Sequence, residues 1–149
     1  MQYDIFSGIN QKNSQHYKEL SEFHEHHRTE IFSQLPFALA ELTYDLSSEE
    51  FLLWISKHGS KKIYLGRDKR KIEKTLDMTI DPSLYTTLCD VSDSANYIEI
   101  PSCWGIFSLY RRIAYEEAFR LGVPDDQLIR QFGVSKRTCT NLRNAISSK

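Results

Sequence analysis

Apolar positions recur mostly at helical spacing along the chain, so the pattern predicts a mainly α-helical protein. Pro36 occupies the first position of a short helix that continues to Leu46. The next helix starts with a capping box, because Ser47 can cap it while Glu50 reaches back. Gly59 is placed to end this helix. The first part of the chain is polar with weaker helical spacing, which indicates a loose helix or an arm.

Two short stretches, 62–65 and 97–100, have strand character. Both are rich in β-branched and aromatic residues and end at a breaker residue. They can pair with each other, within one chain or between two. Between them the sequence predicts a basic helix over 69–76, and a second short helix that Asp81 caps and that runs through Cys89.

After Pro101 the chain is expected to be helical to its end. One long amphipathic helix stops near Gly122, and a short helix from Asp125 through Phe132 precedes a turn and a last helix. The predicted fold class is therefore mainly α with a short two-stranded β element and a C-terminal helix-turn-helix domain. The boundary between an N-terminal region, 1–100, and this domain, 101–149, is expected near Pro101.

The most specific motif lies in residues 127–142, which resemble the helix-turn-helix of bacterial regulators. Leu128 and Phe132 face inward one turn apart, and Gly133 permits the positive φ that a tight turn requires. Val134 is expected to fill the gap between the two helices. Ser135 then caps the second helix.

The second helix of this motif has an apolar and a polar side, at about 100° per residue. Cys139, Leu142 and Ile146 lie on the apolar side. The polar side carries Arg, Lys, Asn and Thr, which pair with base edges and phosphates. The predicted DNA-binding residues are Arg130, Ser135, Lys136, Arg137, Thr138, Thr140, Asn141, Arg143 and Asn144. Of these, Arg130 and Arg143 are expected to contact phosphate and to set the register.

The charge distribution agrees with an anionic partner for the C-terminal end. The net charge is only -1, but after Asp126 there are five basic residues and no acidic one. This asymmetry is typical of nucleic-acid contact, and a solvated charged face has the same composition. A second basic run, 61–74, holds seven Lys and Arg against two Asp and Glu. This run fits a solvated helix face, and it fits equally well a surface that binds flanking phosphate or an acidic partner protein.

Composition narrows the classes of protein that are compatible with the sequence. With 149 residues, 40% hydrophobic, the chain can bury a working core in one domain or two small ones. Its three widely spaced cysteines indicate reduced thiols in the cytoplasm, and no apolar run or signal peptide predicts a membrane span or export. His24, His26 and His27 indicate a metal site only weakly. Without a nucleophile motif, a phosphate loop or a telling carboxylate pair, we expect no enzyme, cofactor or metal.

From the second strand onward, the order of elements resembles the Mor (middle operon regulator) transcription activator family of transposable phages and related mobile elements. A strand ending Ile100-Pro101, a long helix with Arg111-Arg112, Gly122 and then the helix-turn-helix carry this resemblance. It covers about residues 97–146, and more faintly 35–65.

The resemblance implies a homodimer, with region 1–100 as the dimerisation region. The C-terminal motifs would then bind a two-fold promoter site in double-stranded DNA and recruit RNA polymerase. Carried over by position, the DNA face is Lys136, Arg137, Thr140 and Asn141. We therefore expect a dimeric, sequence-specific transcription activator from a phage or mobile element. The alternatives are a repressor or recombination accessory factor with the same motif, and an adaptor whose helical hairpin binds an acidic protein.

Overall fold

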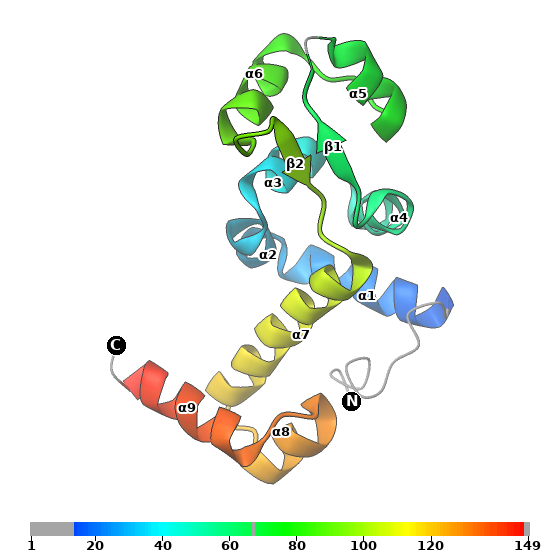
Figure 1. Ribbon diagram of the computed structural model, residues 1–149. Coiled ribbons are helices and arrows are strands. Elements are labelled where there is room, and N and C mark those ends of the chain that lie inside the picture. Colours follow the sequence, from blue (N-terminus) through cyan, green and yellow to red (C-terminus); the bar gives the residue numbers. More distant parts are fainter. Residues whose placement is uncertain (1–13, 67, 148–149) are drawn as a thin grey trace. The chain divides into compact units, whose positions relative to one another are not determined.

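A computed structural model describes residues 14–66 and 68–147 (Figure 1). The described chain is mainly helical with one short two-stranded antiparallel sheet, which confirms the predicted fold class. It divides into two compact units, each described by itself below: a helical unit, residues 14–27 and 107–147, and a mixed unit, residues 28–106. The chain passes between the units twice, between His27 and Arg28 and, within one helix, between Ile106 and Phe107. Within the described ranges, no helix is both long enough and apolar enough to cross a bilayer.

The mixed unit packs helices around the sheet. Its elements are α2 (Arg28–Gln34), α3 (Phe37–Thr43), α4 (Ser48–His58), β1 (Lys62–Tyr64), α5 (Lys69–Leu76), α6 (Pro82–Val91) and β2 (Tyr97–Glu99). One isoleucine from each strand, Ile63 and Ile98, is buried and pairs with the other across the sheet. The core also takes fully buried side chains from the helices, among them Phe51, Ile72 and Leu88. Burying these side chains is the main favourable contribution to the stability of the unit.

Local capping sets where these helices start and stop. The Ser47 hydroxyl accepts from the Glu50 amide at 3.2 Å, and the Glu50 carboxylate accepts from the Ser47 amide at 3.2 Å. Gly59 is the C-cap of the same helix, and Asp81 accepts from the Leu84 amide at 2.8 Å at the start of α6. The predicted capping box, helix end and Asp81 cap are therefore confirmed.

The two strands pair within one chain, which was one of the two arrangements that the sequence left open. β1 and β2 are antiparallel, with Ile63 opposite Ile98. Leu65 donates to the Asn96 carbonyl at 2.7 Å, and Ile100 donates to the Lys61 carbonyl at 2.8 Å. Because main-chain groups alternate sides along a strand, odd-numbered residues of β1 face β2, and Lys62 and Tyr64 direct their main-chain groups to the opposite edge.

At Tyr97, the outer edge of β2 is occupied by the chain itself. The Asp93 amide donates to the Tyr97 carbonyl at 2.9 Å. The Asp93 carboxylate accepts from the amides of Tyr97 and Ala95, each at 2.9 Å. The hydrogen bond from Tyr97, and then that from Ala95, stabilises the ionised form and lowers the pKa of Asp93 below its ordinary value.

This lowered pKa predicts a pH dependence of stability. A carboxyl group whose pKa is depressed by folding stabilises the fold above its unfolded pKa, and this contribution is lost as the pH falls through the folded pKa. Below about pH 4, the stability difference between the wild-type protein and Asp93→Asn should therefore shrink. Urea unfolding of both proteins from pH 6 to pH 3 would measure it. A difference that stays constant over this range would contradict the role of the ionised carboxylate.

The helical unit consists of α1 (Ser14–His26), most of α7 (Cys103–Arg120), α8 (Asp125–Phe132) and α9 (Lys136–Ser147). Tyr110 and Ile113 of α7 are buried, as are Leu20 and Phe23 of α1. α7 ends before Gly122, which has a φ of +83°, as the sequence predicts.

His24 of α1 and His27, which directly follows α1, both contact α7. His24 is fully buried and hydrogen-bonds the Tyr110 hydroxyl, while His27 Nε2 lies 2.6 Å from Glu117 Oε2. The first part of the chain, with its weaker helical spacing, forms two helices: α1 stops at His26, and α2 begins at Arg28 in the other unit. The part of the predicted arm before residue 14 lies outside the described residues.

Candidate nucleic-acid interface

A three-residue turn joins α8 to α9. Gly133 has a φ of +65°, and its amide donates to the Ile129 carbonyl at 2.9 Å, closing α8. The positive φ favours glycine here, and the Arg111 guanidinium of α7 would lie 3.3 Å from a Cβ atom at this position. The predicted positive φ at Gly133 is confirmed.

Ser135 starts α9 as predicted. Its hydroxyl accepts from the Thr138 amide at 3.1 Å, and the two hydroxyl groups lie 3.0 Å apart. This arrangement satisfies one of the otherwise unpaired amides of the first turn. Ser135 and Thr138, both predicted to bind DNA, therefore have a structural task at the start of this helix.

One side of the α8–α9 pair is buried in the helical unit. Leu128 and Phe132 of α8 are at most 1% exposed and Cys139 of α9 is fully buried, which confirms their predicted inward orientation. The Tyr115 ring of α7 meets the Phe132 ring edge-on, with centroids 5.7 Å apart. Burial raises the pKa of Tyr115, and its hydroxyl approaches the Cys139 thiol, which raises that pKa further. α9 is thereby held against α7 along its inner side.

Val134 and Leu142 complete this inner side less fully than predicted. Each is half-buried rather than buried. The side chain of Ile146, predicted for the same side, lies outside the described residues. The inner side therefore depends mainly on the two apolar residues of α8 and on Cys139.

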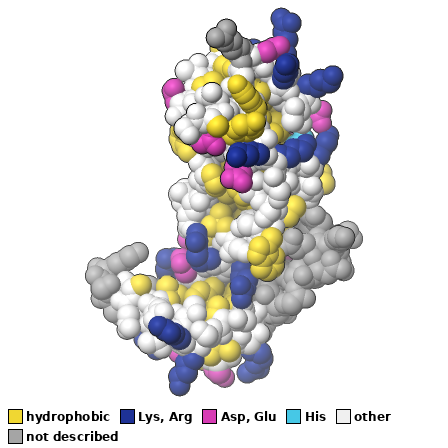
Figure 2. Space-filling model, in the orientation of Figure 1, with side chains coloured by type: hydrophobic (Ala, Val, Ile, Leu, Met, Phe, Trp, Pro, Cys, Tyr) yellow, Lys and Arg dark blue, Asp and Glu magenta, His cyan; other side chains and the backbone are white. Residues whose placement is uncertain are grey.

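The opposite side of α9 is exposed and polar. Lys136, Arg137, Thr140, Asn141 and Asn144 are all exposed, and we call this set the α9 ridge. Thr140 donates its hydroxyl proton to the Lys136 carbonyl at 3.2 Å, which leaves its oxygen and methyl group to face solvent. Among the described residues, the other four ridge side chains make no hydrogen bond or ion pair. Figure 2 shows Lys and Arg side chains standing out from the part of the chain formed by α7, α8 and α9.

The two arginines predicted as phosphate contacts have different surroundings. Arg130 lies 3.8 Å from Asp126 one turn earlier, and both side chains are more than 75% exposed, so this pair holds Arg130 only weakly. Arg143 donates to both carboxylate oxygens of Asp125, at 2.7 and 2.8 Å, and its guanidinium lies 5.7 Å from the Phe119 ring centre. The hydrogen bond to Asp125, and then the charge of that carboxylate, raise the pKa of Arg143 above its ordinary value. Arg143 therefore ties α9 to the first turn of α8.

This pairing predicts a structural effect of Arg143. Arg143→Ala should lower the midpoint of thermal unfolding, because it removes the charge-assisted contact of Arg143 Nη2 in α9 with the Asp125 carboxylate in α8. Asp125→Asn should give a similar decrease, and the double variant should be no less stable than the worse single variant. Calorimetry of the wild-type protein, the two single variants and the double variant measures the coupling free energy between Arg143 and Asp125. Fully additive decreases would contradict the pairing.

The sequence did not reveal two residues that shape this surface. Arg111 lies against the turn, and Asp125 binds Arg143 from 18 positions away. No local pattern could identify either one, because the contacts join separate helices.

Two of the three histidines near the start of the chain, His24 and His27, contact other groups of the same chain. His24 contacts Tyr110, and His27 contacts Glu117 and the Phe23 carbonyl. Within residues 14–66 and 68–147, no three side chains of His, Cys, Asp or Glu are grouped as metal ligands would be.

No protein-family model, curated protein or solved structure matches this chain.

Proposed function

We propose that the chain is a sequence-specific DNA-binding transcription regulator, with the α9 ridge as its reading surface. The observation that carries the proposal is an exposed polar ridge on a helix whose other side is fixed by buried residues; among the described residues, all of its side chains except that of Thr140 make no hydrogen bond or ion pair. Arg137 and Lys136 can pair with guanine edges or phosphate, and Asn141 with adenine. α9 has 12 residues, about 18 Å of helix, which is enough to lie along a major groove roughly 12 Å wide.

The charges around the ridge support this orientation. Asp125, the acidic residue that contacts α9, is neutralised by Arg143, so it does not oppose the approach of a phosphate backbone. Arg130 on α8 is exposed beside the turn and supplies a further phosphate contact. Phosphate contacts would provide most of the affinity, and the ridge would provide the choice of sequence.

The resemblance to the Mor activators adds the mode of action to this proposal. A homodimer would place two copies of α9 about 34 Å apart, in successive major grooves of a two-fold site. Activation would then follow from recruitment of RNA polymerase to a promoter of a phage or mobile element. The cytoplasm is the compartment in which such a regulator acts.

Selection from a random duplex library, followed by shift assays at moderate salt, tests this proposal. The expected result is enrichment of a two-fold sequence and specific retardation of its duplex. Failure of every duplex to bind, together with a stable protein complex in pulldown, would favour an adaptor instead. A promoter fusion carrying the selected site then separates the modes of action, because an activator raises transcription and a repressor lowers it.

A further inference from the structure

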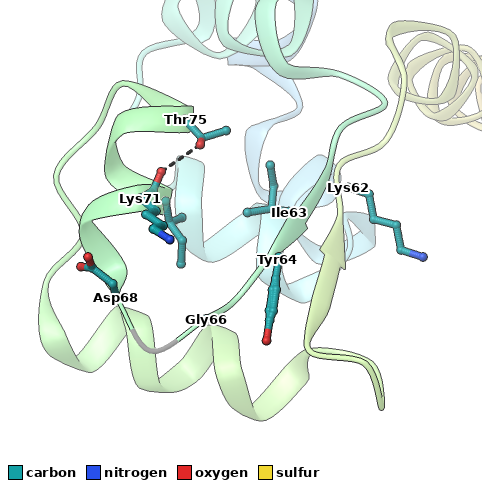
Figure 3. Close-up of a pocket in the computed structure, with 8 residues that line it drawn as sticks. Lys62, Ile63, Tyr64, Gly66, Asp68, Lys71 and Thr75 are labelled. Carbon is teal, nitrogen blue, oxygen red and sulfur yellow. Dashed lines mark hydrogen bonds between the residues drawn. The ribbon is translucent and has the colours of Figure 1, made fainter.

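An open groove lies between β1 and α5 of the mixed unit (Figure 3). Its volume is about 620 Å³, and it is lined by Lys62, Ile63, Tyr64, Gly66, Asp68, Lys71, Ile72 and Thr75. Figure 3 shows α5 on the side of β1 opposite to β2, so the groove follows the outer edge of β1. Ile63 and Ile72 are buried and give it an apolar floor.

This edge of β1 can accept another strand. The sheet in the described chain contains β1 and β2 alone, so β1 has no second neighbouring strand there. The register turns the main-chain groups of Lys62 and Tyr64 away from β2. Asp93 occupies the outer edge of β2 at Tyr97, whereas β1 faces an open groove. An extended segment in this groove could form the alternating hydrogen bonds of strand addition.

The charge of the groove indicates what kind of segment fits. Lys71 lines it from α5, and Arg70 and Lys74 are exposed on the same helix. Figure 2 shows dark blue side chains gathered over this part of the molecule. The acidic lining residue, Asp68, is engaged as the N-cap of α5, accepting from the Arg70 amide at 3.0 Å. The groove is therefore basic beside a strand edge and apolar at its floor.

We propose that this groove binds an extended acidic peptide segment of a partner protein by adding it as a strand to β1. Main-chain hydrogen bonds to Lys62 and Tyr64 would give register, and Lys71 would pair with a carboxylate of the segment. A second copy of this chain fits less well, because pairing β1 with β1 would bring two sets of these cations together. A nucleic-acid strand would match the charge but lacks the alternating amide donors and acceptors of a peptide.

This inference goes beyond the proposed DNA-binding function and does not depend on it. The groove lies in the mixed unit, and the α9 ridge lies in the helical unit. Loss of DNA binding would leave the peptide site intact, and the reverse also holds.

A synthetic peptide tests the proposal with the full-length protein. The probe is a fluorescein-labelled peptide of five Glu-Val repeats, which favours extended structure and carries acid at alternate positions. Fluorescence polarisation should show saturable binding. In the ¹⁵N-labelled protein, the amides of Lys62 and Tyr64 should shift on peptide addition. A five-repeat Lys-Val peptide should not bind, and no saturable binding of the acidic probe would overturn the proposal.

Two charge reversals on α5 distinguish binding of the peptide in the groove from nonspecific electrostatic attraction to the protein. Lys71→Glu should weaken the peptide roughly 3- to 10-fold, because it replaces an attractive pair by a repulsive one. Lys74→Glu makes the same change on an exposed residue of α5 that does not line the groove, and should weaken it less than about 2-fold at 150 mM salt. Equal losses in the two variants would overturn the proposal.

A modified probe tests strand addition without altering the protein. Methylating alternate amide nitrogens of the Glu-Val peptide, on the edge facing β1, removes its donors while keeping its charge. Binding should fall about 10-fold or more, since each lost hydrogen bond costs roughly 0.5–1.5 kcal/mol and the methyl groups also block approach. Unchanged affinity would overturn strand addition. A concentration-dependent dimer that the Glu-Val peptide dissociates would instead identify a second copy as the occupant, and loss of duplex binding in Lys71→Glu but not in Lys74→Glu would identify DNA.

Discussion

Replacing Lys136 and Arg137 together by alanine should weaken binding of the selected duplex by at least about 2 kcal/mol, roughly 30-fold. An arginine that reads a base contributes about 1–3 kcal/mol, and a lysine on phosphate adds to this. The salt dependence should also flatten, since the slope of log K against log salt falls by about one for each lost phosphate contact. Both side chains are exposed, so the fold should not change. Shift assays at several salt concentrations measure both effects.

A matched variant removes the same charge from elsewhere. Arg70 and Lys74 are exposed on α5 of the mixed unit, and their double alanine variant also loses two positive charges. It should bind the selected duplex nearly as well as the wild-type protein. An equal loss in the two double variants, on the selected duplex and on an unrelated duplex alike, would show that positive charge attracts DNA wherever it lies on the protein, and would contradict sequence reading by α9.

Replacing Phe132 by alanine should lower the free energy of unfolding by about 3–5 kcal/mol, the usual cost of removing a buried aromatic ring. Phe132 is 1% exposed, and its ring meets Tyr115 edge-on beneath the turn between α8 and α9. The cavity would release α9 from α7, so DNA affinity should fall as well. Urea unfolding followed by circular dichroism measures the stability change.

Leu121 provides the comparison for this variant. It is also apolar, but it is 67% exposed after the end of α7. Leu121→Ala should change the free energy of unfolding by less than about 0.5 kcal/mol. A loss below about 1 kcal/mol for Phe132→Ala would show that the α8–α9 pair does not depend on this ring.

Features governed by neighbouring residues could be predicted from the sequence. The capping box of Ser47 and Glu50 and the cap at Asp81 involve groups three positions apart, so the sequence contains all their partners. Both strands were predicted within one residue of their observed limits, because β-branched and aromatic runs are local. Whether they pair within one chain could not be predicted, since that pairing joins residues about 35 positions apart.

At the candidate DNA surface too, features set by neighbouring residues could be predicted and contacts between separate helices could not. Helical periodicity alone placed Lys136, Arg137 and Asn141 outside and Cys139 inside. It could not show that Arg143 is bound by Asp125, because that contact depends on how α9 packs against α8. The contact of His27 with Glu117 was not predicted for the same reason, because it joins residues 90 positions apart.

The complete burial of Cys139 allows the local opening of α9 to be followed by chemical labelling. A thiol reagent should modify exposed Cys89 in the native protein at once, but Cys139 only when α9 separates from its neighbours. The labelling rate of Cys139, followed by mass spectrometry of its peptide, therefore reports the free energy of this local opening. A duplex held on the outer side of α9 should slow that reaction and leave the labelling of Cys89 unchanged.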